Sequence, residues 1–453
     1  MAKEYDVIVI GSGGGMKIAL PAARMGLKTA LIEQDAVAGT CLNRGCIPSK
    51  MLIYPSELPG HLQEATRINV KCDTRPTLDF SALITRISQT VDAMSASQRD
   101  ALLSMPNLDF LPEHAEFIED KVIQAGQHVI TAPKIFIATG SRPMIPDIPG
   151  LKNTPFMTST EALRRTSLPE RLIVIGASYI AVELGAAYAG AGAQVDFIVR
   201  SRFLRQEDQE IAQVFAERFS QTHRVHQGIA PTQVSFENGL FTVMFGAQKL
   251  QGDALLVATG TVPCTDNLGL DNAGIHITKQ GFIPVNDHLQ TAVKGVYALG
   301  DCIGHFFFRH TVNYEGEYLV QTVLNSHSNL PLDYGPVPHA IFTNPEVAGV
   351  GLTEEQAQSQ GLDYVVGRAA YSDSNSGLAR GYDHGFAKLI IDRPSRRILG
   401  AHILGPEASN MIHLFIVAMK THATLDDLLD IIFIHPALPE IARDAARDAK
   451  QRF

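Results

Sequence analysis

Cysteine is scarce in this sequence and unevenly spread. Only five of the 453 residues are cysteine, and they stand at positions 41, 46, 72, 264 and 302. Small secreted domains held by disulfides carry cysteine at a much higher density. This scarcity excludes a disulfide framework as the basis of the fold.

Long apolar runs and an excess of basic charge are also lacking. No apolar run reaches the roughly 18 residues of a membrane helix, and the N-terminus enters a strand pattern without a signal peptide. We therefore expect a cytoplasmic protein. Because the net charge is −9, neither nucleic acid nor an anionic membrane is expected as the main partner.

What is present is the composition of a globular protein. Apolar residues make up 45% of the chain and charged residues 19%, which is typical of folded domains and not of disorder. The length predicts about three units of roughly 150 residues.

Two of the cysteines form a close pair, Cys41 and Cys46, in the segment GTCLNRGCIPSK. In a reducing compartment such a pair is more often catalytic or metal-binding than structural. Zinc needs two further ligands, and His61 is the only nearby histidine, so we expect no metal site. An ideal helix would hold the two Cα atoms about 7.5 Å apart, so a disulfide here would require a distorted backbone. The spacing alone leaves the role of the pair open.

A first strand–helix–strand unit opens the chain. Residues 5–10 (YDVIVI) are a continuous apolar strand, GSGGG follows, and a second strand ends at Glu33. Gly11 and Gly13 provide the tight turn that lets a backbone approach a pyrophosphate, and Glu33 suits a ribose hydroxyl. Met16 stands where a third glycine is usual, which weakens the match. The alternative is a glycine turn that only packs a strand against a helix.

A second unit of the same kind begins at residue 171. RLIVIGASYIAVELGAAYAG contains Gly176, and Ser178 and Ala181 replace the second and third glycines. Two such units predict two nucleotide sites. The second strand ends in a segment with Arg200, Arg202 and Arg205 instead of an acidic residue, and arginines there suit a 2′-phosphate. The alternative is a solvated basic loop.

The remaining chain is expected to complete these two units and to add a third domain. Residues 134–143 and 255–263 are predicted strands that close the first and second units, and 295–302 follows as another strand. Strand patterns after residue 336 give way to helices near residues 406, 425 and 436, which indicates an α+β domain. Residues 52–105 are helix-like without a chemical signature.

Taken in order, the motifs resemble the flavoprotein disulfide reductases of the glutathione reductase and dihydrolipoamide dehydrogenase group. They are GTCLNRGCIPSK, the two glycine-rich units, ATGSRP, ATGTVPCTDNLGLDNAG, ALGDC, FTNPEVAGVG and IHPALPE. The resemblance implies an α/β fold of two Rossmann-like nucleotide-binding domains and a C-terminal α+β dimerisation domain. The expected segments are 1–150 and 266–335 for FAD, 151–265 for the nicotinamide nucleotide and 336–453 for dimerisation.

The resemblance also implies roles for matching residues. Cys41 would attack the substrate disulfide, Cys46 would face the flavin, and the thiolate form is the nucleophile in such exchange. His435 and Glu440 would be the acid–base pair that a second subunit contributes, which makes the expected protein a homodimer. Lys50 and Glu183 would form an ion pair near flavin and nicotinamide, Tyr179 would gate the nicotinamide pocket, and Asp301 would bind the flavin ribityl chain. The expected cofactor-binding set is completed by Gly11, Gly13, Glu33, Gly140, Gly176, Arg200, Arg205 and Gly260.

The substrate is the least determined part of the prediction. The basic residue Arg200 at the end of the strand is similar to the pattern of NADPH-dependent reductases. The segments CLNRGCIPSK and TDNLGLDNAG are instead more similar to those of dihydrolipoamide dehydrogenases. We expect FAD, NADPH with NADH possible, and a small disulfide. The alternatives are an NAD-dependent dihydrolipoamide dehydrogenase and a non-catalytic, flavin-binding redox sensor. Mercuric reductase is less expected, because the sequence ends DAKQRF without a cysteine pair.

Two smaller expectations concern single side chains. Arg44, between the two cysteines, would either lower a thiol pKa or simply face solvent, and we favour solvent. Cys72, Cys264 and Cys302 would be small buried hydrophobic residues.

Overall fold

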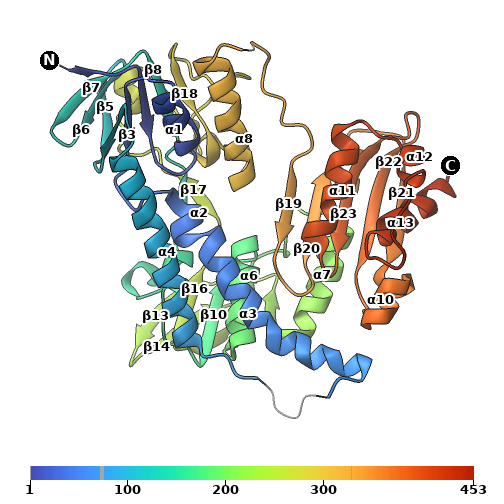
Figure 1. The fold of residues 1–453 in the computed structure, drawn as a ribbon. Helices are drawn as coiled ribbons and strands as arrows, with labels where there is room; N and C mark the ends of the chain where they lie inside the picture. The colour runs from blue at the N-terminus through green and yellow to red at the C-terminus, as the bar shows by residue number, and fades with distance from the viewer. Residues whose placement is uncertain (1, 72–75, 328) are drawn as a thin grey trace. The chain divides into compact units, whose positions relative to one another are not determined.

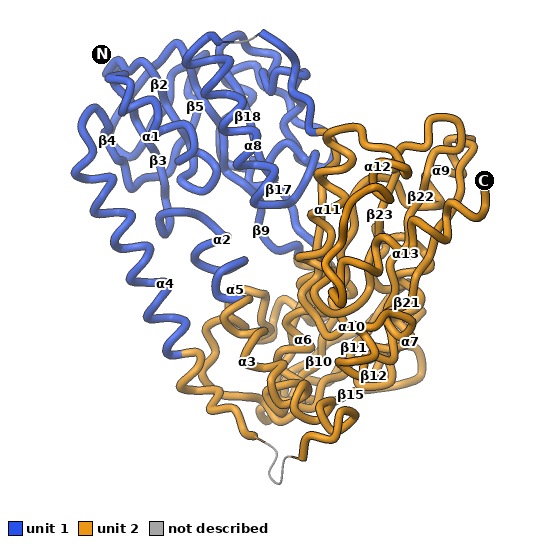
Figure 2. Tube along the Cα trace, turned by 45° about the vertical axis from the view of Figure 1, so that its right-hand side comes forward, with its two compact units in different colours: residues 1–49, 85–144, 260–334 blue, residues 50–84, 145–259, 335–453 orange. Residues whose placement is uncertain are grey.

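The structure is a computed structural model that describes residues 2–71, 76–327 and 329–453. It divides into two compact units, shown in blue and orange in Figure 2. Unit 1 comprises residues 1–49, 85–144 and 260–334, and unit 2 comprises residues 50–84, 145–259 and 335–453. Within the described ranges, no helix has the length and apolar character needed to cross a bilayer.

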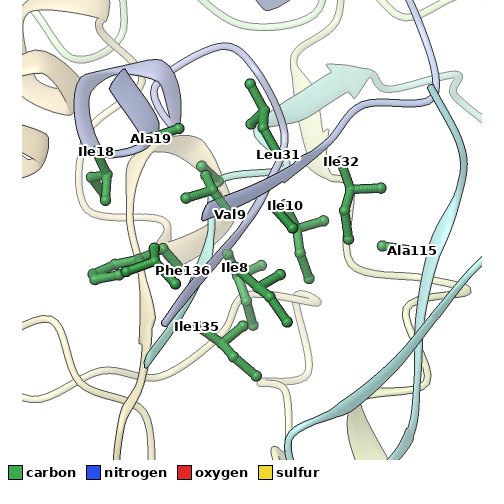
Figure 3. Close-up of a cluster of buried hydrophobic side chains, with 14 of the residues drawn as sticks. Ile8, Val9, Ile10, Ile18, Ala19, Leu31, Ile32, Ala115, Ile135 and Phe136 are labelled. Atoms are coloured by element: carbon green, nitrogen blue, oxygen red, sulfur yellow. The ribbon is translucent and has the colours of Figure 1, made fainter. Parts of the chain in front are cut away.

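Unit 1 is built on a five-stranded parallel sheet. Its order is β18 (Val296–Ala298), β8 (Lys134–Ile137), β2 (Val7–Ile10), β3 (Thr29–Ile32) and β4 (Leu108–Leu111). Strand β2 reads VIVI and is buried along its whole length, as expected for a parallel strand covered on both faces. Figure 3 shows Ile8, Val9 and Ile10 among side chains from β3 and β8 and from helix α1 (Met16–Arg24).

Smaller elements complete unit 1. A second sheet has the order β1 (Lys3–Glu4), β7 (His128–Thr131), β6 (Val122–Ala125) and β5 (Ala115–Glu119), and β9 (Ser141–Pro143) pairs with β17 (Thr261–Pro263). Helix α8 (Arg309–Leu319) packs on α1. The close contact requires glycine, because a Cβ on Gly14 would lie 2.3 Å from Cγ2 of Val312.

Unit 2 repeats the parallel arrangement. Its four-stranded sheet has the order β12 (Arg224–Gln227), β11 (Gln194–Val199), β10 (Arg171–Ile175) and β16 (Ala254–Val257). Helix α6 (Tyr179–Ala191) connects β10 to β11, and α7 (Gln209–Thr222) follows β11. An antiparallel sheet of β13 (Gln233–Glu237), β14 (Leu240–Phe245) and β15 (Gln248–Gly252) stands between β12 and β16 in the chain.

The C-terminal part of unit 2 is an antiparallel sheet, drawn in orange to red in Figure 1. Its order is β19 (Pro338–Ile341), β20 (Val347–Gly351), β23 (Ile398–Leu404), β22 (Phe386–Asp392) and β21 (Tyr364–Ala370). Helices α11 (Ala408–Lys420) and α13 (Glu440–Lys450) pack on it.

The remaining α-helices of the two units are α2 (Gly39–Arg44), α3 (Cys46–Glu64), α4 (Phe80–Leu103), α5 (Ser159–Ala162), α9 (Glu354–Ser359), α10 (Asn375–Arg380) and α12 (Leu425–Leu429).

The predicted fold class is confirmed by two parallel nucleotide-binding sheets and a C-terminal α+β part. The strands that were not predicted are β1, β4 to β7, β12 to β15 and the edge strand β21. The four-segment division into domains stays a prediction. Among the isolated thiols, Cys302 is fully buried as expected, but Cys264 is only half-buried, and Cys72 lies outside the described residues.

Candidate functional site

The first glycine-rich turn joins β2 to α1. Gly11 has a φ of +97°, and a Cβ there would lie 2.4 Å from the carbonyl oxygen of Ala138, so only glycine fits. The missing third glycine is explained by Gly15, where a Cβ would lie 2.1 Å from the Gly11 carbonyl oxygen. Met16 is therefore no obstacle, because the residue before it provides the close packing. The α1 N-terminus has no side-chain cap, so its N–H groups suit a phosphate.

Glu33 follows β3 and is tied to this turn. One oxygen of its carboxylate accepts hydrogen bonds from the backbone N–H of Ser12 at 2.9 Å and from the Ser12 hydroxyl at 2.7 Å. The Ser12 hydroxyl in turn accepts from the backbone N–H of Ala38 at 2.9 Å. These bonds fix the carboxylate at the end of the strand, which is the position predicted for ribose recognition.

Asp301 lies in the 3₁₀ turn Gly300–Ile303, directly after β18. It accepts a hydrogen bond of 2.6 Å from the Ser141 hydroxyl. Burial raises the pKa of Asp301, and the Ser141 hydrogen bond opposes part of that rise. Gly140 has a φ of +69° and nothing within 4 Å of a built Cβ. The uncapped helix, Glu33 and Asp301 form a donor and acceptor set that fits a flavin dinucleotide.

The second glycine-rich turn joins β10 to α6 and repeats the first. Gly176 has a φ of +141°, and a Cβ there would lie 2.1 Å from the carbonyl oxygen of Ala258. The Ser178 hydroxyl donates to this same carbonyl at 3.0 Å and accepts from the Ala181 N–H at 3.4 Å, so it caps α6. Gly260, two residues after Ala258, also has a positive φ of +130°. The turn keeps the nucleotide-binding geometry although two glycines are replaced.

The arginines predicted for a 2′-phosphate lie directly after β11. Arg200 and Arg205 are exposed, and no described residue forms an ion pair or hydrogen bond with either guanidinium. Arg202 donates to the backbone carbonyl of Arg205 at 3.0 Å, which folds the segment on itself. Two unpaired cations thus stand at the end of the second strand of this unit.

The cysteine pair lies at the junction of α2 and α3. Gly45 separates the two helices with φ −140° and ψ −118°, and a Cβ on it would lie 2.9 Å from the carbonyl oxygen of Thr40. This break is a backbone distortion of the kind that a disulfide would require, and the two free thiols are in hydrogen-bond contact. Cys41 is half-buried and Cys46 is exposed.

The two thiols differ in their readiness to ionise. The hydrogen bond to Cys46 raises the pKa of Cys41, burial raises it further, and the positive charge of Arg309 opposes both. A negative charge on Cys46 therefore keeps Cys41 protonated. Arg309 was not singled out in the sequence, because no local pattern marks it. Arg44 is partly exposed and pairs with Asp35 at the surface, in line with the favoured expectation of a solvent-facing side chain.

Lys50 and Glu183 form the predicted ion pair within unit 2. The Lys50 Nζ is 2.9 Å from Oε2 of Glu183 and 4.2 Å from the ring centroid of Phe342. The other carboxylate oxygen accepts the Phe342 backbone N–H at 3.0 Å. Lys50 stands one helical turn after Cys46 on α3, and Tyr179 stands one turn before Glu183 on α6.

His435 and Glu440 also meet as predicted. Nδ1 of His435 is 3.1 Å from Oε1 of Glu440, and the carboxylate accepts from the Ala437 N–H at 3.0 Å and pairs with Arg443 at 3.0 Å. The hydrogen bond from Ala437 lowers the pKa of Glu440, and His435 lowers it further. Because Nδ1 faces the carboxylate and the side chain is 63% exposed, Nε2 is left for an outside group. The pair lies in unit 2, whereas the dithiol lies in unit 1.

A buried cluster was missed in the sequence. Glu207 contacts both His339 and His402, and the next residue, Asp208, pairs with the buried Lys388 at 3.0 Å. The partners in each of these pairs are more than 130 positions apart in the chain, so no local sequence pattern indicates that they meet. Among the described residues, no group of three His, Cys, Asp or Glu side chains is arranged to hold a metal ion.

Comparison with known families decides what this arrangement belongs to. The model of the pyridine nucleotide-disulphide oxidoreductases matches residues 5–327, and the model of their dimerisation domain matches residues 337–446. The chain belongs to this family. Members are flavoproteins that are FAD-dependent and use a pyridine nucleotide, so the recognition made from the motifs is confirmed.

Relatives within the family carry several names. A mercuric reductase of Acidithiobacillus ferrooxidans is 32% identical over 99% of this chain and 84% of its own length. The mycothione reductase of Mycobacterium tuberculosis is 32% identical over 98% and 99%, and dihydrolipoyl dehydrogenase 3 of Haloarcula marismortui is 31% identical over 99% and 97%. These relatives are named for different substrates, so the comparison establishes the family of this chain but not its substrate.

Solved structures agree with the fold. The HOCl-induced flavoprotein disulfide reductase RclA of Escherichia coli, in its Cu(II) complex, has a TM-score of 0.88 and 29% identity. The match covers 98% of this chain and 99% of that one.

Proposed function

We propose that this protein is an FAD-dependent, NADPH-preferring reductase of a small disulfide. The observation that carries the proposal is the thiol pair Cys41 and Cys46, in hydrogen-bond contact at a glycine break between two helices. Support comes from the ion pair of Lys50 with Glu183. A flavin-binding sensor without catalysis would need neither feature.

The chain's own residues account for disulfide exchange. The Cys41 thiol gives its proton to a base and attacks one sulfur of the substrate as the thiolate, a mixed disulfide forms, and the first thiol leaves with that proton. Cys46 then attacks the Cys41 sulfur, the second thiol leaves, and a Cys41–Cys46 disulfide remains. FAD, which Glu33 and Asp301 would hold, would supply the two-electron transfer from NADPH to this disulfide. The sum is one disulfide, one NADPH and one proton converted to two thiols and NADP⁺.

His435 supplies the proton of the exchange in this proposal. Its Nδ1 is engaged by Glu440, which fixes the tautomer and leaves Nε2 to give and take a proton. We infer a homodimer in which this pair serves the dithiol of a second copy. The match to a dimerisation domain and the exposed side chains of Ile432 and Ile434, at 97% and 81%, support it. Sedimentation of the active protein as a monomer would contradict it.

NADPH is preferred in this proposal because Arg200 and Arg205 are unpaired cations after β11. A charge-assisted hydrogen bond to phosphate contributes roughly 1.5–3 kcal/mol, less when exposed. We place the enzyme in the cytoplasm, because a working dithiol of this kind needs a reducing compartment.

An NAD-dependent dihydrolipoamide dehydrogenase is the second candidate. It is favoured by the motif CLNRGCIPSK and by relatives named dihydrolipoyl dehydrogenase. One experiment separates the two: steady-state rates with NADPH and with NADH against lipoamide, glutathione disulfide and a mycothiol-like disulfide. A preference for NADH with lipoamide alone would overturn the first proposal, and absence of disulfide turnover by the FAD-loaded protein would overturn both.

A further inference from the structure

The buried cluster around Glu207 is built from two strands and a loop of unit 2. His339 on β19 and His402 on β23 are both paired in register with Gly349 on the strand between them, β20. A Cβ on Gly349 would lie 2.6 Å from Cε1 of His339 and 2.8 Å from Nδ1 of His402. Glycine at this position therefore makes room for the two imidazoles, and the Glu207 side chain, 0% exposed, reaches both.

The hydrogen bonds of His402 determine its charge. Its Nδ1 is 2.6 Å from Oε1 of Glu207, and its Nε2 is 3.0 Å from the carbonyl oxygen of Leu352. Both partners only accept, so both ring nitrogens donate and His402 is an imidazolium. Burial opposes this charge, but the hydrogen bond with Glu207 raises the pKa of His402 above its ordinary value. With no free lone pair, His402 cannot bind a metal.

Glu207 is correspondingly a carboxylate. Burial alone would raise the pKa of Glu207, but His339 and then His402 lower it well below its ordinary range. One oxygen is held by His402, and the other is hydrogen-bonded to Nε2 of His339. Because both oxygens are engaged, the orientation of the His339 ring is restrained by a carboxylate that is itself fixed.

The His339 ring in turn contacts Tyr179, which follows the second glycine-rich turn. It stacks on the ring of Tyr179, with the centroids 6.1 Å apart and the planes 19° from parallel. Tyr179 is the first residue of α6, one turn before Glu183, whose carboxylate pairs with Lys50. Burial raises the pKa of Tyr179, and the nearby charge of Glu207 raises it further. A stacked pair of this kind contributes about 0.5–1.5 kcal/mol beyond its buried area.

We propose that His339 is a positioning residue for Tyr179: the Glu207 carboxylate, held by His402, orients the His339 ring, and that ring holds Tyr179 in place for the nicotinamide nucleotide. The inference rests on the proposed function and on the family resemblance, which implies a place for Tyr179 at the nicotinamide pocket. A merely structural role of the cluster would instead tie the loop before α7 to the C-terminal sheet and leave nucleotide binding unaffected.

Three substitutions of His339 separate the ring from the hydrogen bond. His339→Phe keeps the stacked ring and loses the bond to Glu207, His339→Gln keeps a donor and loses the ring, and His339→Ala loses both. The KM for the nicotinamide nucleotide and the Kd of its oxidised form, by calorimetry, should rise about three- to tenfold in the Ala and Gln variants. The Phe variant keeps the ring but loses the bond that orients it, so its KM and Kd should rise less, by about two- to threefold. Thermal stability should fall in the Ala and Phe variants, because both lose the hydrogen bond to Glu207.

The FAD content of each variant and His276→Ala, an exposed histidine with a side chain 83% accessible, serve as controls. Equal KM and Kd in wild type and His339→Ala, with raised values in Tyr179→Ala, would overturn the inference and leave the proposed function standing. So would nucleotide binding that follows the hydrogen bond, with Gln normal and Phe weakened. Unchanged nucleotide binding in Tyr179→Ala would overturn both the inference and the proposed place of Tyr179.

Discussion

Lys50 and Glu183 are 133 positions apart in the chain, yet Nζ of the lysine is 2.9 Å from Oε2 of the glutamate. The carboxylate is almost buried, at 9% exposure, and the lysine is 25% exposed. The Phe342 ring and backbone N–H hold the two ends of the pair. A charge pair with every partner engaged suits a group that positions reactants, because its geometry is restrained from several sides.

Replacing Lys50 tests that role. Lys50→Met leaves the Glu183 carboxylate without its cation, so we expect reduction by the nicotinamide nucleotide to slow by about 10- to 100-fold. FAD content should remain near that of wild type. Stopped-flow reduction measures the rate. Lys152→Met is the matched control, because Lys152 is 69% exposed and pairs with an exposed aspartate. An unchanged reduction rate would remove the pair from the site.

The coupling of the two thiols predicts how Cys41 ionises when Cys46 is removed. In Cys46→Ala the hydrogen bond that raises the pKa of Cys41 is gone, so Cys41 should ionise at lower pH. Each unit of pKa decrease gives up to about tenfold more thiolate at neutral pH. Alkylation of the Cys41 peptide by iodoacetamide, followed by mass spectrometry across pH, measures this. If Cys41 is alkylated over the same pH range in Cys46→Ala as in wild type, Cys46 does not determine the pKa of Cys41.

Cys41→Ser should abolish disulfide turnover while diaphorase activity with an artificial electron acceptor remains. The nucleophile toward the substrate is lost, whereas the nucleotide and flavin sites are untouched. Cys264→Ser is the control, since this half-buried thiol is assigned no role. Normal turnover of disulfide by Cys41→Ser would refute the dithiol assignment.

Reversing the charge after β11 tests nucleotide choice. Arg200→Glu should shift the ratio of kcat/KM for NADPH over NADH toward NADH by about a hundredfold, the effect of two weakened phosphate contacts. Binding of 2′,5′-ADP against 5′-AMP gives a readout independent of turnover. The control is Arg218→Glu on α7, whose guanidinium donates to Oε1 of Gln221 at 3.1 Å. A ratio equal in wild type and Arg200→Glu would favour the NAD-dependent alternative.

The Glu207–His402 pair predicts a stability difference with two pH limits. The raised pKa of His402 means that its contribution is complete below about 6.5, the unfolded value, and is lost as the pH rises through the folded value. The lowered pKa of Glu207 means that its contribution is complete above about 4.3 and is lost as the pH falls. The Tm of His402→Gln should therefore fall furthest below wild type between about pH 4.3 and 6.5. A difference in Tm that does not change with pH would contradict this charge state.

The family, the two nucleotide units and the candidate pairs were predictable from the sequence because their signals are local. Gly11 and Gly176 precede helices after apolar strands, the cysteines stand five positions apart, and His435 stands five positions from Glu440. Turn geometry, strand burial and short-range pairing depend on neighbouring residues. Lys50 and Glu183 were assigned only through resemblance, since nothing local joins them.

What the tertiary structure decided depends on contacts between distant segments. Gly15 takes over the packing that Met16 would prevent, because its Cα lies against the Gly11 carbonyl. Arg44 is neutralised by Asp35, and Arg309 acts on Cys41. His339 and His402 come together only when β19, β20 and β23 align them across Gly349 and a loop brings Glu207 against both. A side chain's charge and role depend on burial and partners, and the linear order of residues does not contain these.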